Sequence, residues 1–216
     1  MLEQAEVEAI LHQINTRTPT GARNYGLLQL MLQAGIRCGE ALQVTADMIR
    51  LEQWQDNRGH VPVWVLRLPR KATKGQQGRQ GLPLSSATRQ AIERWQEHRA
   101  ALHVRGGPLF CTVSRGKRRA GFSKSAVLRP GKPLNSRYVR ELVARLAKKA
   151  GISRRVHPHM LRHTALTDLY DRTHDLRMTQ QVAGHSSSRM TERYTHVRPV
   201  DVARAMGAIV EEEAPS

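Results

Sequence analysis

The feature that most constrains the fold is a change of hydrophobic period in the first third of the chain. Apolar residues recur at helical spacing up to about Leu42, and then alternate with polar ones over residues 61–68. This alternation predicts a half-buried strand. A polar, glycine-rich turn over residues 71–80 and a short return strand over 81–84 follow. We therefore expect a small antiparallel sheet inside a mainly helical chain.

Helical patterns predict most of the remaining structure. A first helix near residues 2–14 ends before Thr18-Pro19-Thr20-Gly21, and the next has Tyr25, Leu28 and Leu32 as its apolar face. Capping residues and apolar spacing then predict helices starting at Ser85 or Ser86 and at Asn135, and others over 159–171, 176–183, 187–195 and 200–209. The predicted class is mainly α with a small antiparallel β-sheet (α+β). One domain is expected over 1–210, with a disordered tail at 211–216.

The charge of the chain is far from balanced. Its 216 residues include 35 Lys and Arg against 18 Asp and Glu, a net charge of +17. Residues 105–155 hold fifteen basic side chains and a single acid, Glu141. A solvated surface accounts for only some of them, and such a field attracts polyanions. We therefore expect a surface that follows the phosphates of double-stranded DNA.

Other classes of protein fit the sequence poorly. No apolar run approaches the ~20 residues of a membrane span, and we find no signal peptide or lipidation motif. The two cysteines, Cys38 and Cys111, lack metal-type spacing and make a disulfide framework improbable. We expect a cytoplasmic protein associated with the bacterial nucleoid, and no membrane partner.

The residue types of the C-terminal third suit phosphodiester chemistry. That chemistry needs a nucleophile, cations at the non-bridging oxygens and a proton donor for the leaving oxygen. No cluster of carboxylates suggests a metal site, and His159 and His163 have no acid between them as in a zinc-protease helix. We expect neither a metal nor another cofactor, and a side-chain hydroxyl as the nucleophile.

Two motifs carry these residue types. The segment LMLQAGIRCGEALQV (30–44) contains an R-x-x-E pattern, Arg37 to Glu40. The second motif is PHMLRHT (158–164), followed by VAGHSSSRMTERYTHV (182–197), in which Tyr194 lies nine residues after His185. In order and separation, these segments resemble the two characteristic boxes of the tyrosine recombinase (phage integrase) family. The resemblance covers nearly all of the chain and implies that family's catalytic-domain fold.

The resemblance also implies a role for each matching residue. Arg37 and Arg162 resemble the two arginines that clamp the scissile phosphate, which suits a forked and permanently charged guanidinium. His159 resembles the general acid/base histidine, and His185 resembles the second histidine, which supports the transition state. Tyr194 resembles the nucleophile, whose attack leaves a 3′-phosphotyrosine and a free 5′-hydroxyl.

The family carries a further catalytic residue, a lysine in a β-hairpin turn. Lys71 and Lys74 both fall in the predicted turn, and the distance to Pro83 in the return strand favours Lys74. The implied activity is that of a site-specific recombinase or integrase acting on DNA. The implied assembly is a homo-oligomer, a tetramer, on DNA, with a monomer expected in isolation.

Single residues also have simpler explanations. Arg37 fits a surface arginine paired with Glu40 at helical spacing. A lone Tyr194 fits a core tyrosine, which is the interpretation we give to Tyr138 and Tyr170. Only the joint pattern favours catalysis.

Two other functions stay open: a type IB topoisomerase-like enzyme, and a DNA-binding regulator without catalysis. The chain begins almost at the first catalytic-domain helix, so the family's N-terminal core-binding domain is absent from it. We expect either an excised domain or a naturally short recombinase. Residues 200–210 are expected to dock on a neighbouring protomer or to pack on their own domain.

Overall fold

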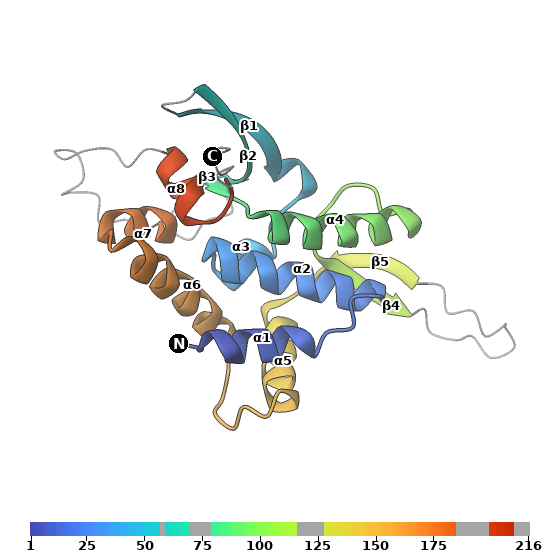
Figure 1. The fold of residues 1–216 in the computed structure, drawn as a ribbon. Helices are drawn as coiled ribbons and strands as arrows, with labels where there is room; N and C mark the ends of the chain where they lie inside the picture. The colour runs from blue at the N-terminus through green and yellow to red at the C-terminus, as the bar shows by residue number, and fades with distance from the viewer. Residues whose placement is uncertain (57–58, 70–78, 116–127, 185–198, 210–216) are drawn as a thin grey trace, which may run out of the picture.

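The fold is mainly helical, as the sequence predicts, and it contains two small antiparallel sheets where the sequence predicts one (Figure 1). The computed structural model describes residues 1–56, 59–69, 79–115, 128–184 and 199–209. Its elements are α1 (Gln4–His12), α2 (Pro19–Ala34), α3 (Cys38–Ala41), the 3₁₀ turn η1 (Ala46–Met48), β1 (Ile49–Asp56), β2 (Gly59–Leu68), β3 (Arg79–Pro83), α4 (Ser86–Ala101), β4 (Cys111–Arg115), β5 (Leu128–Pro133), α5 (Ser136–Lys149), α6 (Pro158–Thr173), α7 (Leu176–Ala183) and α8 (Pro199–Ala205).

Helix α2 occupies the centre of the molecule, in contact with both α4 and α6 (Figure 1). Thr18 caps its N-terminus by accepting a hydrogen bond from the Gly21 N–H, and Pro19 is its first residue. A proline at this position is already set for helical geometry and gives up no needed donor. The Thr18–Gly21 segment therefore starts this helix as well as separating it from α1.

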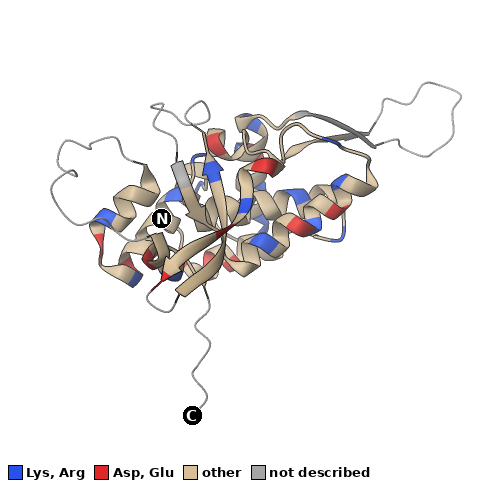
Figure 2. Cartoon of the chain, turned by 90° about the horizontal axis from the view of Figure 1, so that it is seen from above, with Lys and Arg blue, Asp and Glu red and all other residues tan. Residues whose placement is uncertain are grey.

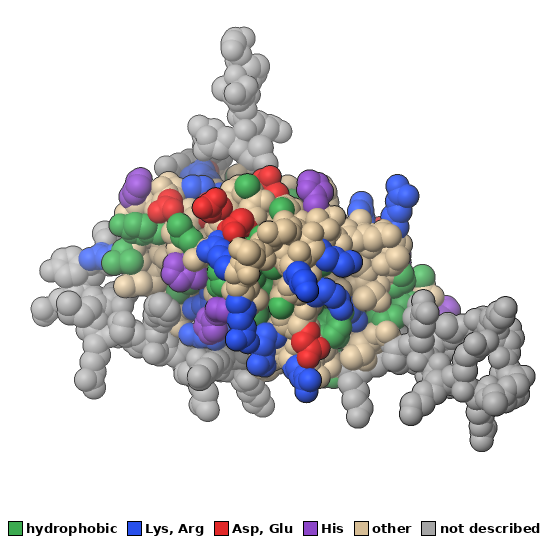
Figure 3. Space-filling model, turned by 90° about the horizontal axis from the view of Figure 1, so that it is seen from below, with side chains coloured by type: hydrophobic (Ala, Val, Ile, Leu, Met, Phe, Trp, Pro, Cys, Tyr) green, Lys and Arg blue, Asp and Glu red, His purple; other side chains and the backbone are tan. Residues whose placement is uncertain are grey.

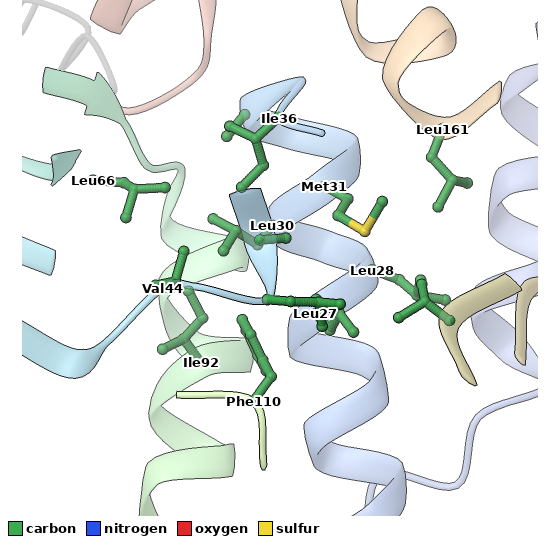
Figure 4. Packing of buried hydrophobic residues seen from close by; sticks show 14 of the residues in the cluster. Leu27, Leu28, Leu30, Met31, Ile36, Val44, Leu66, Ile92, Phe110 and Leu161 are labelled. Atoms are coloured by element: carbon green, nitrogen blue, oxygen red, sulfur yellow. The ribbon is translucent and has the colours of Figure 1, made fainter. Parts of the chain in front are cut away.

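Core residues pack against α2 on several sides and not along a single face. Leu27, Leu28, Leu30 and Met31 are all fully buried, and Figure 4 shows them packed against side chains from several other elements. Of the predicted apolar face, Leu28 is fully buried and Leu32 packs against the core, while Tyr25 is half-buried. A central helix with neighbours on several sides buries more than one stripe.

The first sheet has the strand order β1-β2-β3, all antiparallel. Leu66 of β2 pairs with Ile49 of β1 on one side and with Leu82 of β3 on the other. This confirms the predicted strand and its return. The sequence reading missed β1, and most of the predicted turn over residues 71–80 lies outside the described residues.

The predicted helix caps are confirmed. Ser85 accepts a hydrogen bond from the Thr88 N–H at the start of α4, and Asn135 accepts one from the Tyr138 N–H at the start of α5. The Tyr138 ring is partly buried and packs over the guanidinium of Arg23. Tyr170, by contrast, is 41% exposed, so its predicted core role is wrong.

The last described helix, α8, packs on its own domain. It contacts β1, β3 and α6, and its Ala203 is buried in a cluster with Val63 and Val65 of β2. The predicted helix over 187–195 and the predicted tail at 211–216 lie outside the described residues. In the part of the chain that is described, none of the helices is long and apolar enough to cross a membrane.

Candidate active site

Arg37 lies in the short connection between α2 and α3. Helix α2 ends at Ala34 because Gly35 adopts a left-handed conformation, with φ of 57°. Arg37 then takes the N-cap position of α3. Its backbone N–H and its Nη1 both donate to the Glu40 carboxylate, at 2.7 and 3.0 Å.

Glu40 therefore orients Arg37. The carboxylate side chain is 2% exposed whereas the Arg37 side chain is 29% exposed, so a buried anion holds a partly accessible cation. The ion pair between Arg37 and Glu40, which was the simpler explanation of Arg37 from the sequence, is present. Glu40 is thus a structural partner of Arg37. The pairing fixes the guanidinium without removing it from solvent, as a phosphate ligand requires.

Arg162 on α6 links two segments that are remote in sequence. Its Nη1 donates to the Gly35 carbonyl at 2.6 Å, and its Nη2 donates to the Ala183 carbonyl at 2.8 Å. Gly35 lies two residues before Arg37, and Ala183 lies two residues before His185 in the sequence. The buried Arg162 side chain thus joins the ends of α2 and α7 beside the first motif.

His159 lies one helical turn before Arg162. It is the second residue of α6, after Pro158 at the first helical position, and its side chain is exposed. His159 and Cys38, the residue after Arg37, line one cleft of about 630 Å³. The structure therefore brings Arg37, His159 and Arg162 into one region, although 122 or more residues separate the first from the others in the sequence.

The other predicted site residues are outside the described part of the chain. These are Lys71, Lys74, His185 and Tyr194. Their roles and the choice between the two lysines stay predictions. Among the described residues, no group of three His, Cys, Asp or Glu side chains could hold a metal ion.

The cleft also contains residues for which no individual role was predicted from the sequence. Ser136 and Arg140 come from α5, and Arg155 and His157 come from the segment before α6. The sequence shows the run of basic residues over 105–155. The spacing of these residues does not show which of their side chains line the same cleft as His159. The tertiary contacts of α5 with α3 and with α6 bring them together.

Burial changes the acidity of the one thiol in this cleft. The pKa of Cys38 is raised by burial, against smaller opposing effects from a hydrogen bond with Ser136 and the charge of Arg140. The neutral thiol is therefore favoured. Cys38 has the character of a small, partly buried apolar residue and not that of a nucleophile.

The charges are distributed unevenly over the molecule. On the side viewed in Figure 3, Lys and Arg side chains gather in a band beside histidines. From above, Figure 2 shows acidic and basic positions interspersed along the ribbon. A larger cavity of about 700 Å³ lies elsewhere, between α1, α2, α4 and α6, and the described catalytic candidates Arg37, His159 and Arg162 do not line it.

The helical core places Arg37, the N-cap of α3, near Arg162 of α6, which donates to the Gly35 carbonyl two residues before Arg37. The model of the phage integrase family matches residues 1–200, and the chain belongs to this family. A protein named tyrosine recombinase XerC from Bacillus subtilis (strain 168) is 30% identical over 196 residues, which cover 91% of this chain and 56% of that protein. XerC of Lacticaseibacillus casei (strain BL23) is 26% identical over 194 residues, covering 90% and 57%.

Solved structures agree with this family. The XerH site-specific recombinase bound to difH substrate, in a pre-cleavage complex, has a TM-score of 0.64 at 26% identity and covers 94% of this chain and 52% of that one. The Tn1549 transposon integrase in complex with transposon right end DNA has a TM-score of 0.55 at 21% identity, covering 94% and 64%, and it supports the fold alone. The chain spans a little over half the length of the XerC relatives.

Proposed function

We propose that this chain is the catalytic part of a site-specific DNA recombinase that cleaves and rejoins double-stranded DNA through Tyr194. The observation that carries the proposal is the pair of hydrogen bonds made by Arg162. They join the second motif to the backbone beside Arg37 and to the end of α7. Membership of the phage integrase family and the likeness to the DNA-bound XerH recombinase support it.

The chemistry assigns one task to each group. Arg37 and Arg162 bind the non-bridging oxygens of the scissile phosphate and stabilise the charge that grows there. The Tyr194 hydroxyl attacks phosphorus, the bond to the 5′ oxygen breaks, and a 3′-phosphotyrosine forms. Attack by a 5′-hydroxyl reverses this step, so one phosphoester replaces another and no external energy source is consumed.

Proton transfer needs further groups. His159 is exposed at the edge of the cleft, where a substrate hydroxyl can reach its imidazole, and it serves as general acid and base. His185 donates a hydrogen bond to the transition state. Lys74 protonates the leaving 5′ oxygen, with Lys71 as the alternative.

The whole protein acts as a homo-oligomer, a tetramer, on DNA in the cytoplasm. A type IB topoisomerase-like activity shares this chemistry, but the relatives carry recombinase names, which favours strand exchange. A DNA-binding regulator without catalysis has no need of the Arg37–Glu40 and Arg162 arrangement.

Trapping the covalent intermediate tests this function. The protein is incubated with a pool of nicked suicide duplexes of randomised sequence, and the DNA that stays attached in denaturing gels is sequenced. We expect an enriched target sequence attached through Tyr194, with no adduct from the Tyr194→Phe variant. An adduct that persists in Tyr194→Phe contradicts the assigned nucleophile, and binding without any adduct points to a regulator.

A further inference from the structure

The described residues that line the cleft beside His159 include two arginines and no acidic side chain. Its lining residues are Cys38, Ser136, Arg140, Arg155, His157, Pro158 and His159, and none of them is a carboxylate. Arg140 and Arg155 reach it from two different segments, α5 and the segment before α6, and both are exposed.

Two arginines next to residues of this cleft are neutralised. Arg154 pairs with Glu6, and Arg137 pairs with Glu141 at 2.8 Å. Over the described ranges of the chain, no ion pair joins Arg140 or Arg155 to a carboxylate. The fold therefore pairs the arginines that are adjacent to the cleft residues and leaves positive charge inside the cleft.

The cleft has the size and position of a site for one unit of a nucleic-acid backbone. It measures about 630 Å³, within the ~300–1,000 Å³ typical of ligand pockets. Its wall includes His159 and the residue after Arg37, so it starts where the scissile phosphate is proposed to bind. Successive phosphates on one strand follow at ~3.4 Å of rise along the helix axis, so a neighbour of the scissile phosphate is close enough to reach this cleft.

We propose that this cleft binds a second backbone phosphate, adjacent to the scissile one, through the guanidinium groups of Arg140 and Arg155. This proposal rests on the function proposed above and deepens it. The two arginines act as positioning residues: they fix the register of the cleaved strand, so that the scissile phosphate meets Arg37 and His159. Ser136 at the first turn of the 14-residue helix α5 adds the positive end of a helix dipole to the same anion site.

A chemical change on the DNA isolates this contact from any effect on folding. A methylphosphonate removes the charge of one chosen phosphate, and it is placed in turn at each phosphate of the duplex that the protein binds. In the wild-type protein we expect one flanking substitution to lower the affinity about tenfold. In the double variant Arg140→Gln/Arg155→Gln, that one substitution should have almost no further effect, while all other positions keep theirs. Each single variant should lose part of this sensitivity.

A matched control separates this contact from general loss of charge. Arg154→Gln removes the same charge one residue away, from a side chain already paired with Glu6, and it should retain the full wild-type sensitivity pattern. The slope of log affinity against log salt should become less steep by about one unit in Arg155→Gln. Arg154→Gln should change it by less.

The proposal is overturned if Arg155→Gln and Arg140→Gln remain as sensitive as the wild type to every methylphosphonate. Because binding is measured without cleavage, the result is informative even when no covalent adduct forms. A missing adduct together with a selective loss of sensitivity contradicts the proposed recombinase function and leaves the phosphate site standing. An adduct with unchanged sensitivity supports the recombinase function and contradicts the phosphate site.

Discussion

Replacing Glu40 with glutamine is expected to slow DNA cleavage by loosening Arg37. The Glu40 carboxylate accepts hydrogen bonds from the Arg37 backbone N–H at 2.7 Å and from Nη1 at 3.0 Å. Glutamine keeps the size of the side chain but has a single acceptor oxygen. Its amide nitrogen therefore faces one of the two donors, and that hydrogen bond is lost.

The size of the effect follows from these two contacts. A hydrogen bond to a charged group contributes ~1.5–3 kcal/mol to stability. The Arg37 side chain is 29% exposed, so water recovers part of the loss, and we expect a cost of ~1–2 kcal/mol. If this cost falls on the orientation of Arg37 in the transition state, cleavage slows by about 5- to 30-fold.

Two measurements check this expectation. Single-turnover formation of the covalent adduct gives the rate, and urea denaturation gives the free energy of unfolding. Glu141→Gln is the control, because it removes an exposed i,i+4 partner of Arg137 that contributes little to stability. A Glu40→Gln protein that reacts at the wild-type rate would refute the reasoning, whatever its stability.

Three further outcomes are expected. Arg162→Lys cannot reach both the Gly35 and Ala183 carbonyls, so urea denaturation should show a free energy of unfolding lower by about 2–3 kcal/mol, and adduct formation should be lost. The raised pKa of Cys38 reduces its thiolate fraction, so at pH 8 iodoacetamide should label it more slowly than a free cysteine, as peptide mass mapping over time can measure. The pKa of Glu52 is lowered, chiefly by its hydrogen bond from Arg67. The Glu52–Arg67 pair therefore stabilises the fold at pH values above the unfolded-state pKa. This stabilisation is lost as the pH falls through the lower folded-state pKa. Wild-type and Glu52→Gln melting temperatures should therefore differ at neutral pH and converge below about pH 3, and a difference that persists there contradicts the assignment.

The helices and the main sheet were predictable because local signals specify them. Asn135 and Ser85 are caps whose side chains act within three residues. The apolar residues over 61–68 pack into two clusters, Val63 and Val65 in one and Leu66 and Leu68 in the other. Strand β1 was missed because its burial pattern is not a strict alternation and Leu51 is exposed. The second sheet was missed because β5, LRPGKP, has the composition of a turn.

The site was predictable only in part, for a related reason. A motif identifies Arg37 and Arg162, because their spacing from other motif residues is fixed along the chain. It does not show that Arg162 donates to two backbone carbonyls, or that Arg140 and Arg155 lie in one cleft with His159. Those relations depend on tertiary packing, which no local period encodes.

The two backbone contacts of Arg162 have a consequence for the order of events during folding. They span 127 and 21 residues of sequence, and long-range closures of this kind form late because the chain entropy must be overcome first. The net charge of +17, by contrast, is present from the moment of synthesis. We expect a nascent or partly unfolded chain to adhere to DNA without being able to cut it, so that strand breakage is restricted to molecules that have finished folding.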